Sequence, residues 1–334
     1  MFQLTNRTPF ASDIAVLSDE NGVDSLIVIV KASFRIGRAW QLLDVQSGPY
    51  KSDEYYGEPL TSSLKNASSY HLPKLSTDII VKGSALALDG HMVSAVPVEV
   101  QVGRAVKRVY VFGNRYWDGV KISSPEAFES MPIVYENTYG GQLTGDSGTI
   151  LDTELSNPVG RGLAGCQKIL NGEIPFPNVE DLTQRITSPN DKVVPAGLGY
   201  VAPNWQPRVG FVGTYDDTWS KDRAPFFPLD FNTRFYSMAS SGLVYPGYIH
   251  GSEPVSIRGM NLAGDLEFNL PEVSLNVRVE ERGQDNVNLK LNIETLEILP
   301  NDLELNLTWK AIYISQKEIS DIDNVVVSLR QRSN

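Results

Sequence analysis

The chain has 334 residues and a formal net charge of −11, with 41% hydrophobic and 21% charged residues. The length corresponds to about two domains. This composition predicts a globular protein and disfavours a disordered chain, a non-specific binder of nucleic-acid phosphates and a protein held on an anionic membrane surface.

The cysteine content and the ends of the chain narrow the class further. The single cysteine, Cys166, excludes an intrachain disulfide, and no spacing of cysteine and histidine is typical of a zinc site. The N-terminus lacks the pattern of a signal peptide, and the longest apolar run is too short to cross a bilayer. We therefore predict a cytoplasmic protein that binds no cofactor, metal, nucleic acid or membrane.

Strand patterns dominate the first third of the chain. Residues 25–36 and 76–88 are predicted to be strands that are buried on at least one side. Valines alternate with polar residues over 98–102, which is typical of an antiparallel strand with one face on a core and the other in water. The range 1–122 is therefore predicted to form an N-terminal β lobe.

The range 123–205 is rich in glycine and proline, which predicts an ordered but irregular connection. A capping pattern at Ser124 predicts a short helix over 125–131, and a second one is predicted over 179–186. Aromatic side chains in this range argue against disorder. They are Tyr135, Tyr139, Phe176, Tyr200 and Trp205.

Two short motifs in this connection match known signatures but lack the context that each needs. GRGLAG (160–165) spells a dinucleotide-binding fingerprint, yet Pro158 interrupts the preceding stretch and no helix of normal length can follow. GDSG (145–148) matches the tetrapeptide around the nucleophile of trypsin-like proteases, but no upstream histidine has a recognisable context. Both are predicted to be glycine-rich turns.

The range 206–334 is predicted to form a C-terminal β lobe. Apolar and polar residues alternate over 273–279, 287–293 and 303–309, which predicts three consecutive antiparallel strands. A short helix is predicted over 233–240. The expected fold is thus mainly β, with two antiparallel β-rich lobes, sandwich- or barrel-like, joined by the irregular connection and a few short helices.

The most unusual stretch is GTYDDTWSKDRAPFFPLDF, residues 213–231. Paired carboxylates can act as acid and base on a sugar, so Asp216 and Asp230 with Trp205 and Trp219 indicate a carbohydrate-binding or glycoside-processing protein. Against this, adjacent aspartates on an extended loop point to opposite sides, and the prolines fix the backbone. In the alternative interpretation, Asp216 caps a turn and Asp230 caps the following helix.

A static aromatic surface suits protein binding, because tryptophan, tyrosine and arginine carry most of the energy of interfaces. Arg208, Arg223 or Arg234 is expected to pair with these aspartates and to rigidify the loop. We predict no catalytic residue. The predicted partner-binding residues are Tyr135, Trp205, Arg208, Tyr215, Trp219, Arg223 and Phe227. For each of them, burial in the seam between the lobes is the alternative.

Ten motifs follow one another along most of the range 1–300. They are NRTPF (6–10), VKASF (30–34), YYGEPLTSSL (55–64), LPKLSTDIIVKGSA (72–85), VFGNRYW (111–117), MPIVYENTYGG (131–141), NPVGRG (157–162), PAGLGYVAPNWQPR (195–208), GTYDDTWSKDRAPFFPLDFNTRF (213–235) and HGSEPVSIRGM (250–260). In this order they resemble a bacterial family catalogued as a domain of unknown function and encoded in type VI secretion clusters, beside toxic effectors and spike-tip proteins.

This resemblance implies a non-enzymatic adaptor or chaperone. Such a protein would bind a type VI effector, or the spike-docking domain of that effector, in the producing cell and would assist its loading onto the secretion spike. The resemblance implies no catalytic residues. Two alternatives stay open at this point, a carbohydrate-binding or glycoside-processing protein and a structural part of the secretion machine.

Overall fold

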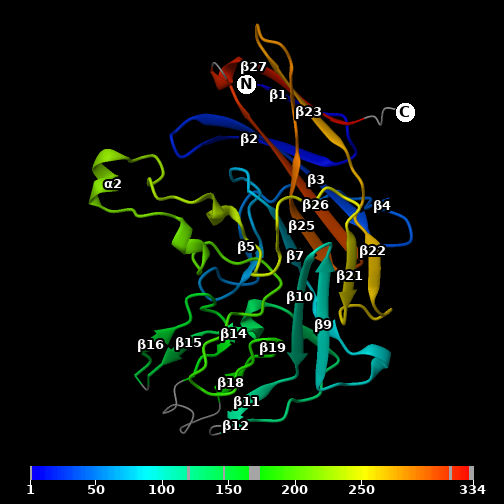
Figure 1. The fold of residues 1–334 in the computed structure, drawn as a ribbon, viewed down its shortest axis with the longest axis vertical. Helices are drawn as coiled ribbons and strands as arrows, with labels where there is room; N and C mark the ends of the chain where they lie inside the picture. Colours follow the sequence, from blue (N-terminus) through cyan, green and yellow to red (C-terminus); the bar gives the residue numbers. More distant parts are fainter. Residues whose placement is uncertain (1, 119–120, 146, 165–173, 316–317, 331–334) are drawn as a thin grey trace.

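The computed structural model describes residues 2–118, 121–145, 147–164, 174–315 and 318–330 (Figure 1). The fold is mainly β, as predicted from the sequence. Among the described residues α2 (Asp217–Asp222) is the one α-helix. The remaining helical segments are the 3-10 helices η1 (Leu88–Gly90), η2 (Tyr135–Asn137), η3 (Arg208–Phe211), η4 (Thr233–Tyr236) and η5 (Ile319–Asp321).

A seven-stranded sheet forms the centre of the molecule. Its strands, in spatial order, are β2 (Ala11–Ser18), β3 (Asp24–Arg35), β26 (Glu304–Ile314), β25 (Asn292–Leu299), β7 (Thr77–Val81) and β20 (Val244–Tyr245), with β4 (Gln41–Leu42) paired to β3. The long strands β3 and β26 pair antiparallel from Ser25 opposite Ile314 to Arg35 opposite Glu304. Strands from the two ends of the sequence therefore lie side by side at the centre of the sheet.

Two further sheets flank the central one. The five-stranded sheet has the order β19 (Val179–Asp181), β10 (Ala105–Phe112), β9 (Ala95–Val102), β21 (Pro254–Arg258) and β22 (Leu266–Asn269). The four-stranded sheet has the order β1 (Gln3–Asn6), β27 (Ile322–Leu329), β23 (Leu275–Glu281) and β24 (Val287–Leu289). β1 runs parallel to β27, and the other pairs in these two sheets are antiparallel.

The remaining strands are short and form small sheets of two or three strands. They are β5 (Glu54–Tyr55) with β6 (Leu64–Asn66), β8 (Ser84–Leu86) with β13 (Ser130–Pro132), β14 (Tyr139–Gly140) with β17 (Arg161–Gly162), β15 (Gln142–Thr144) with β16 (Ile150–Thr153), and β11 (Arg115–Asp118) with β12 (Lys121–Ile122) and β18 (Ile174–Phe176). Residues 146 and 165, which belong to the GDSG and GRGLAG motifs, and Cys166 lie outside the described residues.

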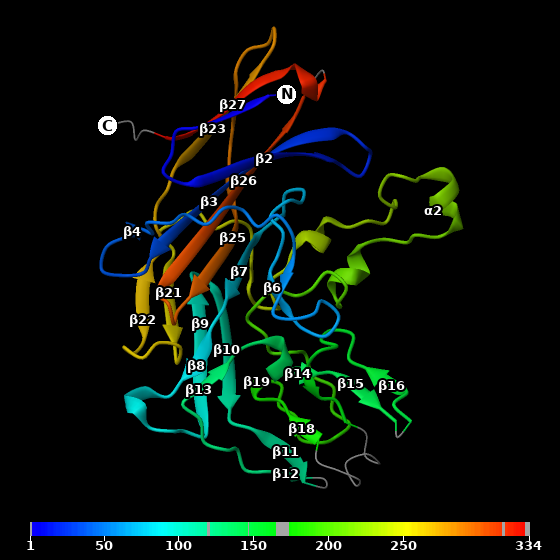
Figure 2. The ribbon, with the colours of Figure 1, turned by 180° about the vertical axis from the view of Figure 1, so that it is seen from behind.

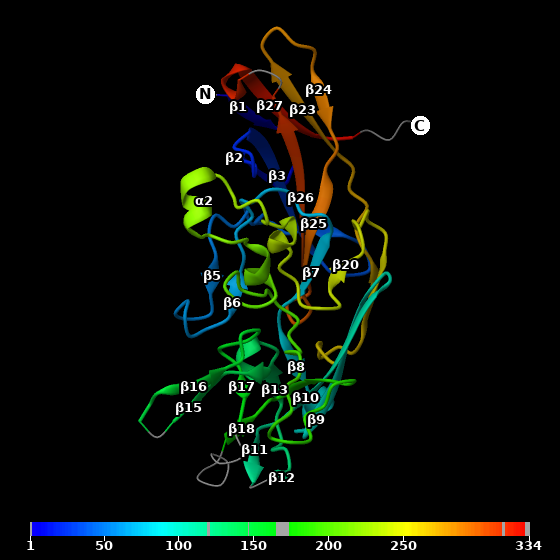
Figure 3. The same ribbon diagram turned by 60° about the vertical axis from the view of Figure 1, so that its left-hand side comes forward.

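The sheets do not follow the predicted division of the sequence at residues 122 and 205. β3 pairs with β26 and β9 pairs with β21, so strands of the first and last ranges share two of the sheets. The prediction of three consecutive antiparallel strands over 273–279, 287–293 and 303–309 is also corrected, because these ranges do not form one sheet. The β23–β24 hairpin belongs to the four-stranded sheet, whereas β25 and β26 belong to the seven-stranded sheet (Figure 3). Alternation could not reveal this switch, because both sheets require the same period of two.

Two of the predicted short helices are wrong. In the range 125–131, Glu126 N–H donates to the Asn114 carbonyl and Phe128 forms a bridge with Val93, and β13 follows. The range 179–186 begins as β19, which pairs with β10. In both cases a neighbouring segment of the same chain provides partners for the backbone hydrogen-bonding groups. These contacts override a weak local preference for helix. The range 233–240 contains only the 3-10 helix η4.

The central sheet is buried on both faces. On one face, Leu26 and Val28 of β3 belong to the main apolar core, together with Leu307 of β26 and Val100 of β9. On the other face, the alternate β3 residue Ile27 packs in a second cluster with Leu72 and Tyr236. The sheet is therefore the middle layer of the molecule.

The second face also carries charged side chains that are shielded from water. We call them the buried charge layer. Its members are Lys31, Lys74, Asp78, Lys82, Glu294, Glu297 and Lys310. Lys31 and Lys82 lie 3.4 and 2.7 Å from the carboxylate oxygens of Glu297. Lys74 lies 2.6 Å from Asp78, and Lys310 lies 3.4 Å from Glu294. Opposite charges thus compensate one another at positions where isolated ions would be costly.

A β-bulge places two of the carboxylates on this face. The register between β25 and β26 shifts between Ile293 and Thr295, so that Glu294 has no partner in the ladder. A bulge redirects side chains locally. As a result, Glu294 and Glu297 lie on the same side of the sheet although they are three residues apart. Glu294 approaches Lys310, and Glu297 pairs with Lys31.

The loops that cover this face of the sheet make further contacts with the charged side chains. The Tyr200 hydroxyl donates to Glu297 over 3.0 Å, and the ammonium of Lys31 lies 3.4 Å from the centre of the Tyr50 ring. The Met238 N–H donates to Asp78 over 2.7 Å. The buried charge layer therefore fixes the covering loops on the sheet, and these loops lead into the segment 213–231.

We expect replacement of Glu297 by glutamine to destabilise the protein strongly, because Lys31 and Lys82 would lose their shared anion inside the protein. Removing one partner of a buried ion pair costs about 3–5 kcal/mol. Urea unfolding measures this loss. The matched control is Glu267→Gln on β22, where the side chain is exposed, with an expected change within about 0.5 kcal/mol. Equal small losses in both variants would contradict the role of the layer.

We also expect a pH dependence from Lys310. Burial lowers the pKa of Lys310 to about 7, compared with about 10.4 in an unfolded chain. Between these values the unfolded state binds the extra proton, so folding is favoured as the pH rises. The stability of the wild type relative to Lys310→Met should increase from pH 7 towards pH 10, by up to about 1.4 kcal/mol per pH unit. A constant difference across this window would refute the lowered pKa of Lys310.

Candidate functional site

Residues 213–231 form an arm that stands apart from the sheets, as two opposite views show (Figures 1 and 2). The arm leaves the body after η3 and returns to it before η4. Asn232 holds the two ends together, because its N–H donates to the Phe211 carbonyl over 2.9 Å and its side chain accepts from Arg234 N–H over 3.0 Å. Asn232 is thus the N-cap of η4 and closes the base of the arm.

Hydrogen bonds and ring contacts give the arm a defined shape. The Asp216 carboxylate accepts from the Trp219 N–H over 2.8 Å and caps α2. The Trp219 indole packs edge-on against the Tyr215 ring at 4.6 Å and donates to the Phe226 carbonyl over 2.8 Å. Asp230 accepts from the Thr214 N–H and hydroxyl and so joins the two ends of the arm.

The arm is also attached to the turn between β2 and β3. The Arg223 guanidinium donates to the Glu20 carbonyl and to the Phe227 carbonyl. Phe226 packs on Gly22, which has φ of +79°, and a Cβ atom at this position would lie 2.0 Å from the Phe226 ring. Only glycine permits both this backbone conformation and the close approach. The arm is therefore held against the body rather than tethered loosely.

This ordered arm leaves much of its apolar surface in water. Pro228 is the only buried residue in the range 213–231, and α2 buries none. The exposed fractions are 88% for Leu229, 49% for Tyr215 and 41% for Phe226. An ordered element that exposes several large apolar side chains marks a site of interaction.

A groove with a volume of about 440 Å³ lies at the base of the arm. Phe211 and Arg234, which flank the arm in the sequence, form part of the wall of this groove. Further lining residues are Leu75, Tyr135, Val194, Pro195, Arg208 and Val244. Leu75 and Val194 are 67% and 54% exposed at the rim. The groove therefore lies beside the segments that flank the arm, and its lining is largely apolar.

The seven predicted partner-binding residues fall into two adjacent sets. Tyr135, Trp205 and Arg208 are buried, with exposed fractions of 2–6%. The Tyr135 and Trp205 rings pack edge-on at 5.3 Å, and Arg208 donates to backbone carbonyls. Tyr135 and Arg208 line the groove, so this set supports the surface from beneath. The other four, Tyr215, Trp219, Arg223 and Phe227, belong to the arm itself.

Several predicted roles within this stretch are corrected. Asp230 does not cap the following helix; Asn232 does so. Arg208 and Arg223 donate to carbonyl groups rather than to Asp216 or Asp230. Leu229, the most exposed large apolar residue of the arm, was not predicted, because a lone leucine between a proline and an aspartate gives no local signal of exposure.

The two aspartates of the carbohydrate hypothesis serve the structure of the arm. Asp216 caps α2, and the hydrogen bonds from Thr214 lower the pKa of Asp230. A general acid in glycoside hydrolysis needs a raised pKa instead. Across the described ranges, no group of three or more histidine, cysteine, aspartate or glutamate residues could hold a metal ion. The same part of the chain contains no helix long and apolar enough to cross a membrane.

A lysine lies next to a serine that lines the groove. Lys107 donates to the Ser240 hydroxyl over 2.9 Å and to the Ser241 carbonyl over 2.8 Å, and burial lowers the pKa of Lys107 to about 8. Both contacts join Lys107 to the turn that begins at Ser240.

We expect Asp216→Ala to loosen the arm without affecting the core. Loss of an N-cap costs about 1 kcal/mol, and α2 buries no residue that would transmit this loss. Hydrogen exchange should therefore accelerate over 217–222 while the thermal midpoint stays constant. Asp222→Ala, at the other end of α2, is the control and should not accelerate exchange. A lower midpoint for Asp216→Ala would mean that the arm is part of the cooperative core.

Comparison with known proteins places these features in a family. Residues 21–310 match a family described as "Uncharacterized protein conserved in bacteria (DUF2169)". The matched range includes β3, most of β26, the groove and the whole arm. No curated protein and no solved structure matches the chain. Because the match covers most of its length, the chain belongs to this bacterial family.

Proposed function

We propose that this protein is a non-enzymatic adaptor or chaperone for a type VI secretion effector. It binds the effector, or the spike-docking domain of the effector, in the cytoplasm of the producing cell and assists its loading onto the secretion spike. The secretion context comes from the order of sequence motifs. The proposal of a protein partner is supported by the geometry of the arm and its groove.

The carrying observation is that the arm is ordered and yet unburied. Three sets of hydrogen bonds hold its shape. Asp216 caps α2, Asp230 accepts from Thr214, and Arg223 donates to the Glu20 carbonyl. A preorganised surface loses little conformational entropy on binding, which strengthens an interface of a given area. Tyr215, Phe226 and neighbouring apolar groups then provide the aromatic anchors that interfaces favour.

The charge of the arm indicates what its partner presents. Asp216, Asp217 and Asp222 are exposed on or beside α2, where Lys221 is the one exposed cation. The groove beside it is largely apolar. A complementary partner surface would therefore be apolar at its centre and basic at its rim.

Co-expression tests this proposal directly. The tagged protein is expressed with each product of its neighbouring genes, captured, and analysed by size exclusion. A stable complex with a toxin or a spike-tip protein is the expected result. A well-folded protein that captures none of these products would overturn the adaptor proposal.

The contact surface can be tested with two matched leucines. Leu229 on the arm is 88% exposed and Leu60, in a loop before β6, is 85% exposed. We expect Leu229→Glu to reduce partner capture at least about tenfold, because it places a charge at the centre of the interface. Leu60→Glu should keep full capture, and both variants should keep the thermal midpoint of the wild type.

The outcomes separate two questions. If both variants capture the partner equally well, the arm is not the contact surface although the adaptor function stands. If the wild type captures nothing, the function itself is wrong. A large fall in the midpoint of Leu229→Glu would show that this side chain stabilises the fold.

A further inference from the structure

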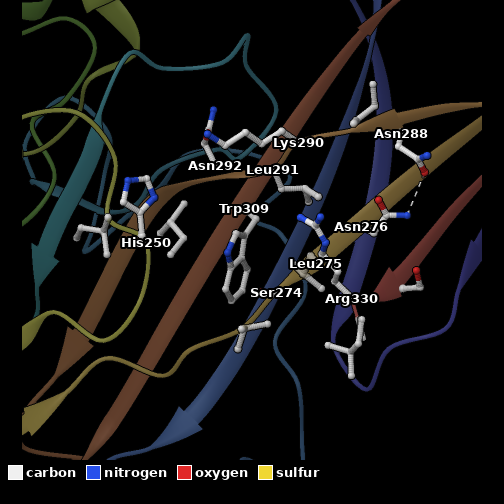
Figure 4. A pocket seen from close by; sticks show the side chains of 16 residues that line it. His250, Ser274, Leu275, Asn276, Asn288, Lys290, Leu291, Asn292, Trp309 and Arg330 are labelled. Atoms are coloured by element: carbon white, nitrogen blue, oxygen red, sulfur yellow. Dashed lines mark hydrogen bonds between the residues drawn. The ribbon is translucent and has the colours of Figure 1, made fainter. Parts of the chain in front are cut away.

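A second groove, with a volume of about 730 Å³, lies where the four-stranded and seven-stranded sheets separate (Figure 4). It shares no lining residue with the groove at the base of the arm. Its floor contains Ile293 of β25 and Trp309 of β26, which are both 3% exposed. The groove is therefore open to solvent above a firmly packed base.

The path of the chain explains why this groove exists. The β23–β24 ladder ends at Leu289, and the β25–β26 ladder begins at Asn292. Lys290 and Leu291 lie between the two ladders and carry the chain from one sheet to the other. Because the sheets diverge there, side chains from both line the space between them (Figure 4).

The lining has a charge opposite to that of the whole protein. The chain has a net charge of −11, but no aspartate or glutamate is among the described residues that line this groove. Lys290 and Arg330 contribute two cations, and both are exposed. Among the described residues, neither forms an ion pair with a carboxylate. The groove is thus a basic site whose cations face solvent.

Amide and apolar groups are distributed along the same groove. Asn276 donates to Asn288 over 3.2 Å, and these two amides lie at one end (Figure 4). His250 and Asn292 lie towards the other end, and Arg330 lies between the two groups (Figure 4). The apolar lining comprises Val273, Leu275, Leu289, Leu291 and Leu329. Because the polar groups are spread out rather than convergent, they suit an extended ligand better than a single small anion.

A neighbouring hollow extends the site. It has a volume of about 470 Å³, shares His250, Val273, Ser274, Leu329 and Arg330 with the second groove, and is also lined by Glu272. The second groove itself provides length, hydrogen-bonding amides, apolar contacts and positive charge, while the hollow adds space beside Glu272. A polypeptide segment in extended conformation, with acidic side chains between apolar ones, satisfies all four.

We propose that the second groove binds an extended acidic segment of a partner polypeptide. Carboxylates of the segment pair with Lys290 and Arg330, while its backbone hydrogen-bonds to the asparagine amides. Its apolar side chains pack on Leu289 and Leu291. This inference does not depend on the arm, since the two surfaces have no residue in common.

Fluorescence anisotropy with a defined probe tests the proposal. The probe is a fluorescein-labelled, end-capped peptide of twelve residues that alternates glutamate with valine and leucine. The comparison peptide has glutamine in place of each glutamate. We expect the acidic probe to bind at least about tenfold more tightly, and its affinity to fall as salt screens the charges.

Charge reversal locates the site. We expect Lys290→Glu combined with Arg330→Glu to weaken binding of the acidic probe at least about tenfold. The control combines Arg38→Glu with Lys65→Glu, which changes the net charge equally at two exposed positions outside the groove. It should keep nearly full affinity. Asn288→Asp, a nearly isosteric change within the groove, should also weaken binding and serves as a second variant if the first one misfolds.

Three results would overturn the proposal. Equal binding of the acidic and the glutamine peptide would remove the role of charge. Equal loss in the groove variant and the control would indicate the overall field of the protein rather than a site. Competition by inorganic phosphate at low millimolar concentration would indicate a small-anion site. The Leu229→Glu variant should bind the probe normally, so failure here is distinguishable from failure of the adaptor proposal.

Discussion

The buried charge layer is the constraint on which the placement of the arm depends. A sheet face that carries buried lysines and carboxylates can be covered only by segments that satisfy the remaining hydrogen bonds. Asp78 therefore holds the Met238 N–H, the Met238 carbonyl accepts from Val201, and the Val201 carbonyl accepts from Arg208. Arg208 begins η3, so a chain of hydrogen bonds leads from the central sheet to the base of the arm.

The same layer explains which parts of the fold could be predicted from the sequence. The alternation over 303–309 identified a strand correctly, but it indicated one face in water. In the structure Asn306 and Thr308 are buried, because they lie on the face that carries the charge layer. A polar residue at alternate positions of a strand indicates only that one face of the strand is not apolar. Whether that face meets water or buried ions depends on residues far away in sequence, such as Asp78 and Tyr200.

The candidate site shows the same limit at the level of single side chains. The composition of residues 213–231 identified an unusual aromatic segment, and in the structure this segment is the arm. Trp205 and Trp219 nevertheless have opposite surroundings, since the first is 2% exposed and the second lies half-buried on the arm. No local pattern distinguishes them, because burial is decided by which distant segments pack around each ring. The switch of sheets at Lys290 was hidden for a related reason, as both sheets share one period.

The arm and the second groove carry opposite charges. The arm combines exposed aspartates with apolar anchors, whereas the second groove combines lysine and arginine with asparagine amides. Surfaces of opposite charge on one rigid body favour two different segments over two copies of the same segment. If both segments belong to one partner, the second contact forms at a high effective concentration once the first is made. A partner could then be bound tightly through two contacts of moderate affinity, each of which dissociates separately. This property suits a protein that must hold its cargo and later give it up.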